Sequence, residues 1–381
     1  MSGMHDVIVI GAGPAGCSAA ICLCLRGRAV TILEKNRQPW KKLCAGGLPP
    51  KVVGVLPANL EGLVEQSVCK IRFGYEGRRS FELAFKRPVV HLVQRHLLDQ
   101  RLVQQAVGLG ARLVEGAAVV ELQPEAQRVL VKTTKHTYQA RVVIAADGAL
   151  GAGARLLGHQ GIRLCPAVQV DVKLSRRKMK PYRNMLACDF GVLPGGIGWV
   201  FPKRDRLSVG LCSFGARANL KAALEKYLRI EGLDSGRISP IESHPLSTWD
   251  GRRVFSKGSV LMVGDAAGLV NPLTGAGIRR ACISGQLAAE AAHAYLAGGA
   301  VCQKDLASYD RRVNADLVDE LARARLLARL FYRAPGLFYR IGVMNARINP
   351  WVGELLSGQK SYLEVFRELL SGGWISRPRP L

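Results

Sequence analysis

The segment VIVIGAGPAG, residues 7–16, constrains the fold of this 381-residue chain more than any other stretch. Four apolar residues suited to a buried strand lead into Gly11, Gly13 and Gly16, spaced as G-x-G-x-x-G, and a helical apolar pattern follows to about Leu25. In this setting the first glycine permits a tight turn, the second lets the backbone approach a pyrophosphate, and the third allows close helix packing. The segment therefore predicts the strand–turn–helix start of a dinucleotide-binding α/β domain.

The second predicted strand, AVTILE, ends at Glu34. A carboxylate at this distance from the glycine turn accepts hydrogen bonds from the ribose of an adenosine, and it would repel the 2′-phosphate of NADP. We expect Ala15 and Lys35 to contact the same dinucleotide.

Two later segments favour FAD over NAD as that dinucleotide. The segment AADGAL contains Asp147 and Gly148, and the segment VGDAAGLVNPLTGAGI contains Gly264 and Asp265; each follows an apolar strand pattern. The ribitol chain and flavin ring of FAD extend beyond the pyrophosphate, so that a distant carboxylate such as Asp265 can bind a ribitol hydroxyl.

A helix is predicted to open after Pro272, with its N-terminus aimed at the flavin ring, where it would favour the negative charge of the reduced state. Gly275, Gly277 and Ile278 complete the predicted cofactor contacts. The chain has a single G-x-G-x-x-G unit, so we expect no separate nicotinamide-binding domain. Electrons would then come from transiently docked NAD(P)H or from a protein donor such as ferredoxin.

The pattern of predicted elements divides the chain. Strands and helices alternate at both ends of the first 300 residues, whereas alternating short strands such as AVQVDVKLS and RLSVGLCSF dominate between about Cys165 and Ser247. We predict an α/β fold with a Rossmann-like FAD-binding domain, an inserted, mainly antiparallel β-sheet substrate domain, and a helical, basic C-terminal region. The expected boundaries are 1–67, 88–164 and 254–300 for the first, 68–87 and 165–253 for the second, and 301–381 for the third.

The net charge of +25, from 54 basic and 29 acidic side chains, favours anionic partners in general. A phosphorylated substrate and an anionic membrane surface both fit, and no recognition motif for nucleic acid accompanies the charge. Arg325, Arg329 and Arg333 recur at i, i+4 spacing in a predicted helix, either as a membrane-facing row or as a solvated face.

We expect neither a cleaved signal peptide nor a membrane-spanning segment, because strand-like sequence begins near residue 7 and no run of eighteen apolar residues occurs. The ten cysteines are scattered, without a Cys-x-x-Cys pair or a histidine cluster, which predicts reduced thiols and no metal site. These features favour the cytoplasm, with peripheral attachment to the inner face of the membrane left open.

Several motifs together resemble those of a known family. GAGPAG, Glu34, Arg95 in QRHLLDQRL, Asp147 with Gly148, and Gly264 with Asp265 are similar to the FAD-binding motifs of the p-hydroxybenzoate hydroxylase-like flavoproteins. More narrowly, LCAGGL, GWVFPKRDRLSVG and GDAAGLVNPLTGAGI resemble stretches of the geranylgeranyl reductase family. The resemblance spans residues 1 to about 300. It implies FAD and hydride delivery to carbon–carbon double bonds of an isoprenoid lipid or a prenyl diphosphate, often at a membrane surface.

Three positions depart from the family pattern. The family commonly has tyrosine where Ile197 stands, glycine where Arg204 stands and glutamate where Ala276 stands. These differences concern the substrate and leave the flavin motifs intact.

The resemblance also gives Cys44 a position near the flavin. An isolated alkene is not electrophilic, so its reduction requires a proton source, and a thiol in a dry pocket can donate or relay that proton. Gly46 and Gly47 would let the backbone approach the ring. The alternative is that Cys44 is a small buried apolar residue.

Candidate substrate contacts are Trp199, Phe201 and Pro272. The first two share one face of a predicted strand and would line a tunnel for a prenyl chain, unless they serve ordinary core packing. Three lysines are candidates for contact with a diphosphate, unless they are simply solvated: Lys41, Lys42 and Lys203.

Two other functions remain open at this point. An aromatic monooxygenase would use the same flavin motifs with oxygen. A catalytically lapsed flavoprotein that binds a membrane surface would use the basic C-terminal region.

Overall fold

The structure is a computed structural model of the chain. It describes residues 3–39, 42–77, 79–156, 163–215, 218–298, 303–340, 351, 353–355 and 360–371.

The first domain is built on an eight-stranded, largely parallel sheet with the strand order β18-β19-β11-β1-β2-β8, and the hairpin of β9 and β10 is attached to β11. The central strands of this sheet, β1, β2 and β11, are buried over most of their length, as their continuous apolar sequences predict. The strands are β1 (His5–Ile10), β2 (Val30–Glu34), β8 (Arg112–Glu115), β9 (Val119–Pro124), β10 (Val129–Thr133), β11 (Thr137–Ala145), β18 (Ser256–Lys257) and β19 (Val260–Met262).

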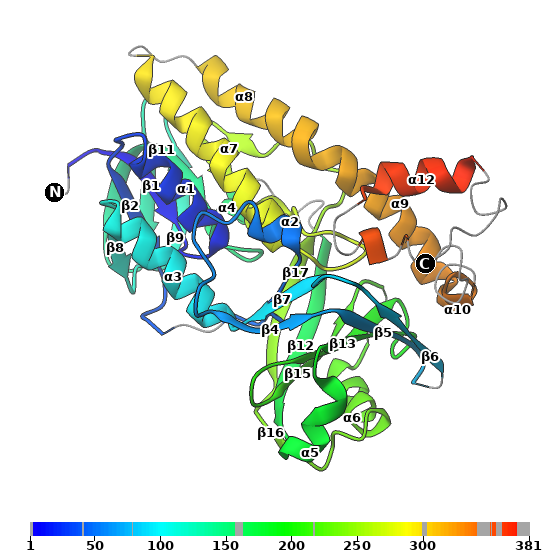
Figure 1. Ribbon diagram of the computed structural model, residues 1–381. Helices are drawn as coiled ribbons and strands as arrows, with labels where there is room; N and C mark the ends of the chain where they lie inside the picture. Colours follow the sequence, from blue (N-terminus) through cyan, green and yellow to red (C-terminus); the bar gives the residue numbers. More distant parts are fainter. Residues whose placement is uncertain are drawn as a thin grey trace.

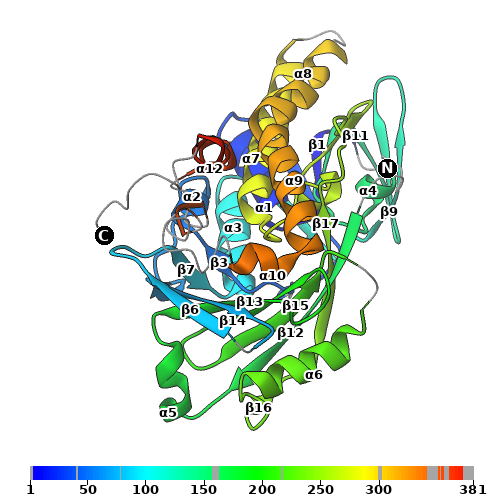
Figure 2. The ribbon, with the colours of Figure 1, turned by 90° about the vertical axis from the view of Figure 1, so that its right-hand side faces the viewer.

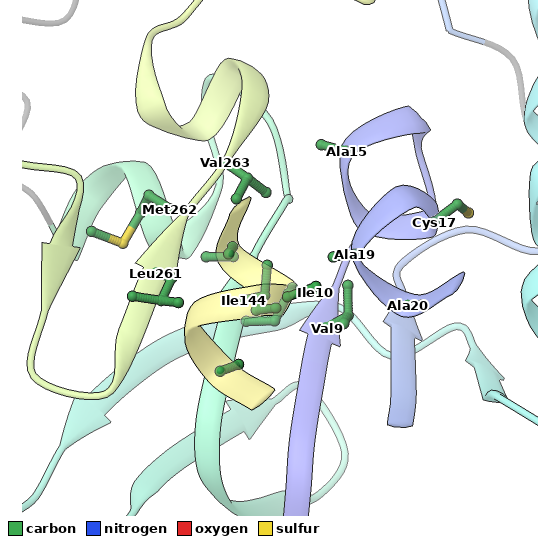
Figure 3. Packing of buried hydrophobic residues seen from close by; sticks show 14 of the residues in the cluster. Val9, Ile10, Ala15, Cys17, Ala19, Ala20, Ile144, Leu261, Met262 and Val263 are labelled. Carbon is green, nitrogen blue, oxygen red and sulfur yellow. The ribbon is translucent and has the colours of Figure 1, made fainter. Parts of the chain in front are cut away.

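Helices α1 (Pro14–Cys24) and α7 (Ile278–Ala297) pack tightly against each other. A side chain at Gly285 would lie 2.3 Å from the carbonyl oxygen of Ala15, so the absence of a side chain sets the closeness of the two helices. Figure 3 shows Ala19 of α1 beside Val9 and Ile10 of β1, with Ile144 of β11 next to them. A third helix of this domain, α3 (Arg95–Gly108), contacts α1.

The second domain is an eight-stranded sheet with the order β16-β12-β15-β14-β13-β5-β6, and β17 also pairs with β12. All its pairings are antiparallel except that of β13 with β5. Figure 1 shows this sheet as a separate layer below the first domain. The strands are β5 (Lys70–Tyr75), β6 (Arg79–Ala84), β12 (Arg163–Lys173), β13 (Met185–Phe190), β14 (Gly196–Pro202), β15 (Leu207–Ser213), β16 (Arg237–Ile238) and β17 (Glu242–Thr248).

One face of the second sheet is covered by α5 (Arg176–Met179) and by the amphipathic helix α6 (Leu220–Ile230). Val200, Val209, Leu224 and Tyr227 are among the residues of the apolar cluster beneath these helices. Because strand residues alternate between faces, the other face of the sheet carries the intervening residues of β12, β14 and β15.

A small sheet of β3 (Gly47–Leu48), β7 (Val90–Val93) and β4 (Val64–Val68) lies between the two domains, next to the short helix α2 (Pro50–Val53). It places the segment around Cys44 beside the second sheet. The domain boundaries stay a prediction; β5 and β6 pair within the second sheet although they precede α3 in the sequence.

The C-terminal region is helical, and its helices lead from the first domain to the second. Helix α8 (Gln303–Val313) lies along α7, and a π-helical turn (Asn314–Val318) continues it into α9 (Asp319–Arg333). Figure 2 shows α9 and α10 (Pro335–Phe338) reaching the second sheet, where the hydroxyl of Tyr339 donates to the carbonyl oxygen of Phe73 at 3.1 Å. A further helix is α12 (Tyr362–Leu370), and no helix in the described ranges is both long and apolar enough to cross a bilayer.

Candidate functional site

The turn between β1 and α1 has the geometry that its glycines predict. Gly11 has a φ of +94°, and a side chain at Gly16 would lie 2.0 Å from the carbonyl oxygen of Gly11. Gly13 is different, because a side chain there would meet no described atom within 4 Å. The N-terminus of α1 has neither a side-chain cap nor an acidic residue in its first turn. Its free N–H groups can therefore receive an anion such as a pyrophosphate.

Glu34 lies at the end of β2 next to this turn. Its carboxylate accepts hydrogen bonds from the backbone N–H of Ala12 at 2.9 Å and of Asn36 at 3.0 Å. The side chain is thereby held at the position where the sequence predicts contact with a ribose, and the neighbouring Lys35 is exposed.

Segments from the ends of β11 and β19 converge on the same turn. A side chain at Gly11 would lie 2.5 Å from the carbonyl oxygen of Ala146, directly before Asp147 and Gly148. A side chain at Gly264 would lie 3.1 Å from the side chain of Ala15. Three segments that are far apart in the sequence thus meet at one end of the parallel sheet, which is where ligands bind in open α/β sheets.

Asp147 has a buried carboxylate close to this turn. One of its carboxylate oxygens accepts the N–H of Gly153 at 3.1 Å, and the other is buried without a partner among the described residues. Burial raises the pKa of Asp147 despite these backbone N–H contacts. An unpaired buried oxygen beside a nucleotide-type turn fits a ligand that supplies a donor.

Asp265, in the segment after β19, forms an ion pair with Lys42. The distance from Lys42 Nζ to Asp265 Oδ2 is 3.4 Å. Burial lowers the pKa of nearby His244 to about 4, and the positive charge of Lys42 contributes. His244 Nε2 is buried with no partner in the described part of the chain. Sequence reasoning missed this histidine, since a single histidine in an ordinary strand gives no signal.

The helix predicted to open after Pro272 begins at Ile278, with Gly277 as its N-cap. The intervening residues form a turn in which the side chain of Asn271 accepts the N–H of Leu273 at 2.8 Å. Gly275, within this turn, has a φ of +71°. The asparagine side chain accepts N–H groups that a helix would otherwise use, so the residues between Pro272 and Gly277 form a turn and the helix starts after them.

Arg95 begins α3 and is buried. It contacts both carboxylate oxygens of Asp99 at 3.1 Å. Burial alone would lower the pKa of Arg95, but the carboxylate of Asp99 and the thiol of Cys44 more than offset it and raise the pKa. The guanidinium group is therefore charged and lies beside Cys44.

The Cys44 loop, residues 43–47, is held on several sides. The Sγ atom of Cys44 accepts the N–H of Gly46 at 3.3 Å. Gly46 has a φ of +72°, and a side chain there would lie 2.0 Å from the carbonyl oxygen of Val93. At Gly47 a side chain would lie 2.8 Å from the ring of Phe201. Both glycines are thus needed for close approach of the loop to its neighbours.

Lys203 is buried, so the alternative that it is simply a solvated lysine does not hold. It is only 3% exposed, and its Nζ donates to the carbonyl oxygens of Ala45 at 2.7 Å and Val93 at 2.8 Å. Burial lowers the pKa of Lys203 to about 8, while Cys44 and Glu65 act in the opposite direction. Lys41, the first lysine of the predicted set, lies outside the described residues.

A cavity of about 510 Å³ opens beside this loop. Its inner wall, the buried and half-buried part of the lining, contains Lys42, Cys44, Arg95 and Lys203. Its rim, the exposed part, is formed by the end of β12 and the segment around β16. The remaining lining residues are Val93, Gln94, His96, Gln169, Asp171, Lys173, Arg206, Ser208, Arg237, Ile238, Ser239, Pro240 and Glu242.

The predicted substrate residues lie outside this cavity. Trp199 and Phe201 occupy alternate positions of β14 on the face turned toward the first domain. The ring of Trp199 covers Gly210, where a side chain would lie 2.2 Å from it. Pro272 is buried in the turn before α7.

Trp199 belongs to an apolar wall at the far end of the same sheet face, defined by Cys165, Ala167, Trp199, Cys212, Phe214, Leu246 and Tyr332. The nitrogen of the Trp199 ring is buried without a partner among the described residues. The three departures from the family pattern lie around these regions: Ile197 packs against the wall, Arg204 is exposed at the β14–β15 turn, and Ala276 is exposed before α7.

FAD fits these residues. The bare N-terminus of α1, the open space at Gly13 and the unpaired oxygen of Asp147 are all at the converging turn. When FAD is bound, Glu34 would hold its ribose, the α1 N-terminus with Arg95 its pyrophosphate, and Asp265 its ribitol chain. No group of three histidine, cysteine or acidic residues is placed to bind a metal ion within the described ranges.

Comparisons with known proteins agree with FAD as the cofactor. The model of a family described as "FAD binding domain" matches residues 4–313. Digeranylgeranylglycerophospholipid reductase 1 of Methanopyrus kandleri is 30% identical, over 85% of this chain and 90% of that protein. The chloroplastic geranylgeranyl diphosphate reductase of Nicotiana tabacum is 29% identical, over 86% of this chain and 75% of that protein.

Solved structures show the same fold at lower identity. A geranylgeranyl bacteriochlorophyll reductase-like structure from Thermoplasma acidophilum has a TM-score of 0.81 at 21% identity, covering 97% of this chain and all of that chain. A probable FAD-dependent monooxygenase from Pseudomonas aeruginosa has a TM-score of 0.64 at 19% identity, covering 86% and 96%. The fold alone therefore does not separate reductases from monooxygenases, whereas the sequence relatives do. The chain belongs to the geranylgeranyl reductase family of FAD-dependent oxidoreductases.

Proposed function

We propose that this protein reduces carbon–carbon double bonds of an isoprenoid chain carried by a lipid or a prenyl diphosphate. The names of the relatives support the reaction class. The observation that carries the proposal is the placement of Cys44 at the wall of the cavity together with two buried cations, Arg95 and Lys203.

Bound FAD supplies the hydride for such a reduction. The protein must supply a proton, because an isolated alkene accepts a hydride only as positive charge builds on the adjacent carbon. Cys44 is the proposed donor. The charges of Arg95 and Lys203 would stabilise the thiolate that remains after transfer.

The apolar wall is the proposed surface for the prenyl chain. It lies on the same sheet face as the cavity and includes Tyr332 of α9. A chain laid along this face would have its apolar part on Trp199 and Phe214 and its reacting bond toward Cys44. Hydrophobic contact of this kind tolerates a range of chain lengths.

The reaction can be tested in anaerobic single turnovers with chemically reduced enzyme and a geranylgeranylated phospholipid. We expect the product to gain two hydrogen atoms for each bond reduced, measured by mass spectrometry. In Cys44→Ser we expect FAD to be retained and alkene reduction to slow. Cys69→Ser is the matched control, since Cys69 is half-buried outside the site. An unchanged rate in Cys44→Ser would remove Cys44 from the mechanism.

Aromatic monooxygenation is the alternative activity, and it is supported by the likeness of the fold to that of a probable monooxygenase. The need for oxygen distinguishes the two activities. A reductase saturates its substrate without oxygen, whereas a monooxygenase gives an oxygenated product only when oxygen is present.

The electron donor is proposed to be NAD(P)H docked transiently or a ferredoxin-like protein. The bleaching of flavin absorbance on mixing with NADH, NADPH or reduced ferredoxin measures this directly. The donor that reduces the flavin at a rate no slower than turnover is the physiological type.

We also propose that the protein works in the cytoplasm at the surface of an anionic membrane. Leu326, Leu330 and Leu337 of the α9–α10 segment are 51%, 46% and 56% exposed. Arg329 and Arg333 are exposed between them. Exposed leucines with interleaved arginines suit the boundary between acyl chains and anionic head groups. Tyr332 of the same helix packs into the apolar wall, so a membrane here would lie near the proposed path of the prenyl chain.

Sedimentation with vesicles that contain anionic lipid tests this attachment across a salt series. We expect Leu326→Ser/Leu330→Ser to bind more weakly than the wild type. Leu25→Ser is the control, since Leu25 is 67% exposed in the first domain. Equal binding by both variants would contradict the α9 surface, and binding without turnover would favour the lapsed-enzyme alternative.

A further inference from the structure

Two cations at the cavity rim face each other across a strand pair. Lys173 of β12 lies directly opposite Arg237 of β16 in the antiparallel register. Both side chains line the cavity, so they point to the same side of the sheet. Like charges directly opposite each other in a strand pair are destabilising. Such a pair is expected where an anion is bound between them.

The nearby carboxylates do not neutralise the rim. Asp171 is already engaged by Arg206 at 3.0 Å and by the hydroxyl of Ser208 at 2.8 Å. Asp205 contacts Arg206 at 2.8 Å and reaches Lys173 only at 3.8 Å. Within the described chain Arg237 has no acidic partner inside 4 Å. The positive charge of Lys173 and Arg237 is therefore largely uncompensated.

The lining of the whole cavity has the same imbalance. Six lysine and arginine side chains line it, against two carboxylates, those of Asp171 and Glu242. Three of the six already have a carboxylate partner: Arg95 contacts Asp99, Lys42 contacts Asp265 and Arg206 contacts Asp171. Lys173 and Arg237 at the rim have no carboxylate closer than 3.8 Å among the described residues, so they are the cations left for a second anionic group.

The residues along β12 indicate which class of molecule carries the anionic group that would bind at the rim. Along β12, alternate residues of one face run from Cys165 and Ala167 in the apolar wall, through Gln169, to Asp171 and Lys173 at the rim. The face therefore changes from apolar to cationic along its length. This gradient matches an amphiphile with an apolar chain and an anionic head.

We propose that Lys173 and Arg237 form a phosphate-binding subsite at the cavity rim, and that its ligand is the phosphate or diphosphate head of the isoprenoid substrate. The assignment of the head group rests on the proposed function; the phosphate subsite does not. The same chemistry would bind the phosphates of NADPH, which is the other possible source.

The test is the double variant Lys173→Gln/Arg237→Gln in the full-length, FAD-loaded protein. We expect KM for a geranylgeranyl diphosphate substrate to rise about 10- to 100-fold, since two charge-assisted hydrogen bonds are lost. We expect kcat, FAD affinity and KM for the uncharged alcohol geranylgeraniol to stay unchanged. Lys226→Gln/Arg229→Gln on α6 is the matched control, because it removes the same charge from an exposed surface of the second domain. Equal KM changes for the diphosphate and the alcohol would overturn the proposal.

Two further arms separate the sources. Slower flavin reduction by NADPH, with KM for the diphosphate substrate unchanged, would assign the rim to the nicotinamide donor and overturn the head-group assignment. Calorimetric titration with inorganic pyrophosphate needs no turnover. Binding that is weakened in the double variant but not in the control supports the subsite even if alkene reduction is absent, and equal binding in all three proteins refutes it.

Discussion

Lys203 donates a hydrogen bond from Nζ to the carbonyl oxygen of Ala45 at 2.7 Å. This contact ties the turn between β14 and β15 in the second domain to the Cys44 loop. A second bond from the same ammonium group, to Val93 at 2.8 Å, includes β7 in the connection. One buried cation thus joins three segments at the cavity wall.

Replacing this lysine by methionine tests its role. In Lys203→Met, two backbone carbonyl oxygens lose their donor, at about 1–3 kcal/mol each when buried, while removal of a buried charge offsets part of this. We expect a net loss of about 1–3 kcal/mol in the free energy of unfolding, measured by urea denaturation, together with slower alkene reduction. Lys70→Met, at an exposed position of β5, is the control. If both variants match the wild type in the free energy of unfolding, the hydrogen bonds of Lys203 do not stabilise the fold.

The sequence was sufficient to predict FAD as the cofactor because the motifs that indicate it are local. The turn at Gly11 and the strand that ends at Glu34 each follow from a short pattern of spacing and residue type, and the ends of parallel strands necessarily meet at one edge of the sheet. FAD, the α/β fold with an antiparallel second sheet, and the family were all predictable in this way.

The remainder depends on strand register and burial, which no short pattern encodes. The burial of Lys203 results from the packing of three segments that are distant in the sequence. The pairing of Lys173 with Arg237 requires the register of β12 with β16. His244 lies at the site because β17 pairs with β12 and also contacts the turn after β19, and neither contact can be read from a short pattern.

The glycines of the first turn are expected to respond differently to the same substitution. In Gly16→Ala the new methyl group would lie 2.0 Å from the carbonyl oxygen of Gly11, so we expect loss of folded protein or of several kcal/mol of stability. In Gly13→Ala the methyl group meets no described atom, so the stability of the protein without FAD should be unchanged. Its FAD affinity should fall about tenfold or more, because the methyl group occupies the approach of the pyrophosphate. Thermal unfolding and FAD fluorescence titration measure the two effects. Equal FAD affinity in Gly13→Ala and wild type would place the pyrophosphate elsewhere.

Glu34 and Glu115 offer a matched pair of carboxylates, since the two residues are partners in the register of β2 with β8. Glu34→Ala removes the acceptor of the Ala12 N–H and the proposed ribose contact. We expect FAD affinity to fall about 10- to 100-fold, equivalent to one or two charge-assisted hydrogen bonds. Glu115→Ala removes an acceptor for the exposed Gln38 N–H and should leave FAD affinity unchanged in the same fluorescence titration. A similar loss in both variants would indicate a general effect of the strand pair and not a ribose contact.

Asp189 predicts a pH dependence of stability inside the second domain. Its carboxylate accepts the hydroxyl of Tyr227 at 2.6 Å and lies 3.8 Å from Arg72. Burial raises the pKa of Asp189 to about 6, with Glu231 adding to the effect and Tyr227 and Arg72 opposing it. The folded state therefore holds this proton more tightly than the unfolded state. The stabilisation is present at low pH and is lost as the pH rises through about 6.

Between pH 5 and pH 7.5 this group should lower the free energy of unfolding by about 1–2 kcal/mol. In Asp189→Asn the amide cannot titrate and can still accept the hydroxyl of Tyr227. The variant should thus gain stability relative to wild type as the pH rises over this range, measured by urea unfolding at both pH values. Asp205→Asn, at an exposed position, should follow the wild-type slope. A wild-type slope in Asp189→Asn as well would mean that the proton is taken up elsewhere and that the carboxylate of Asp189 is ionised throughout the range.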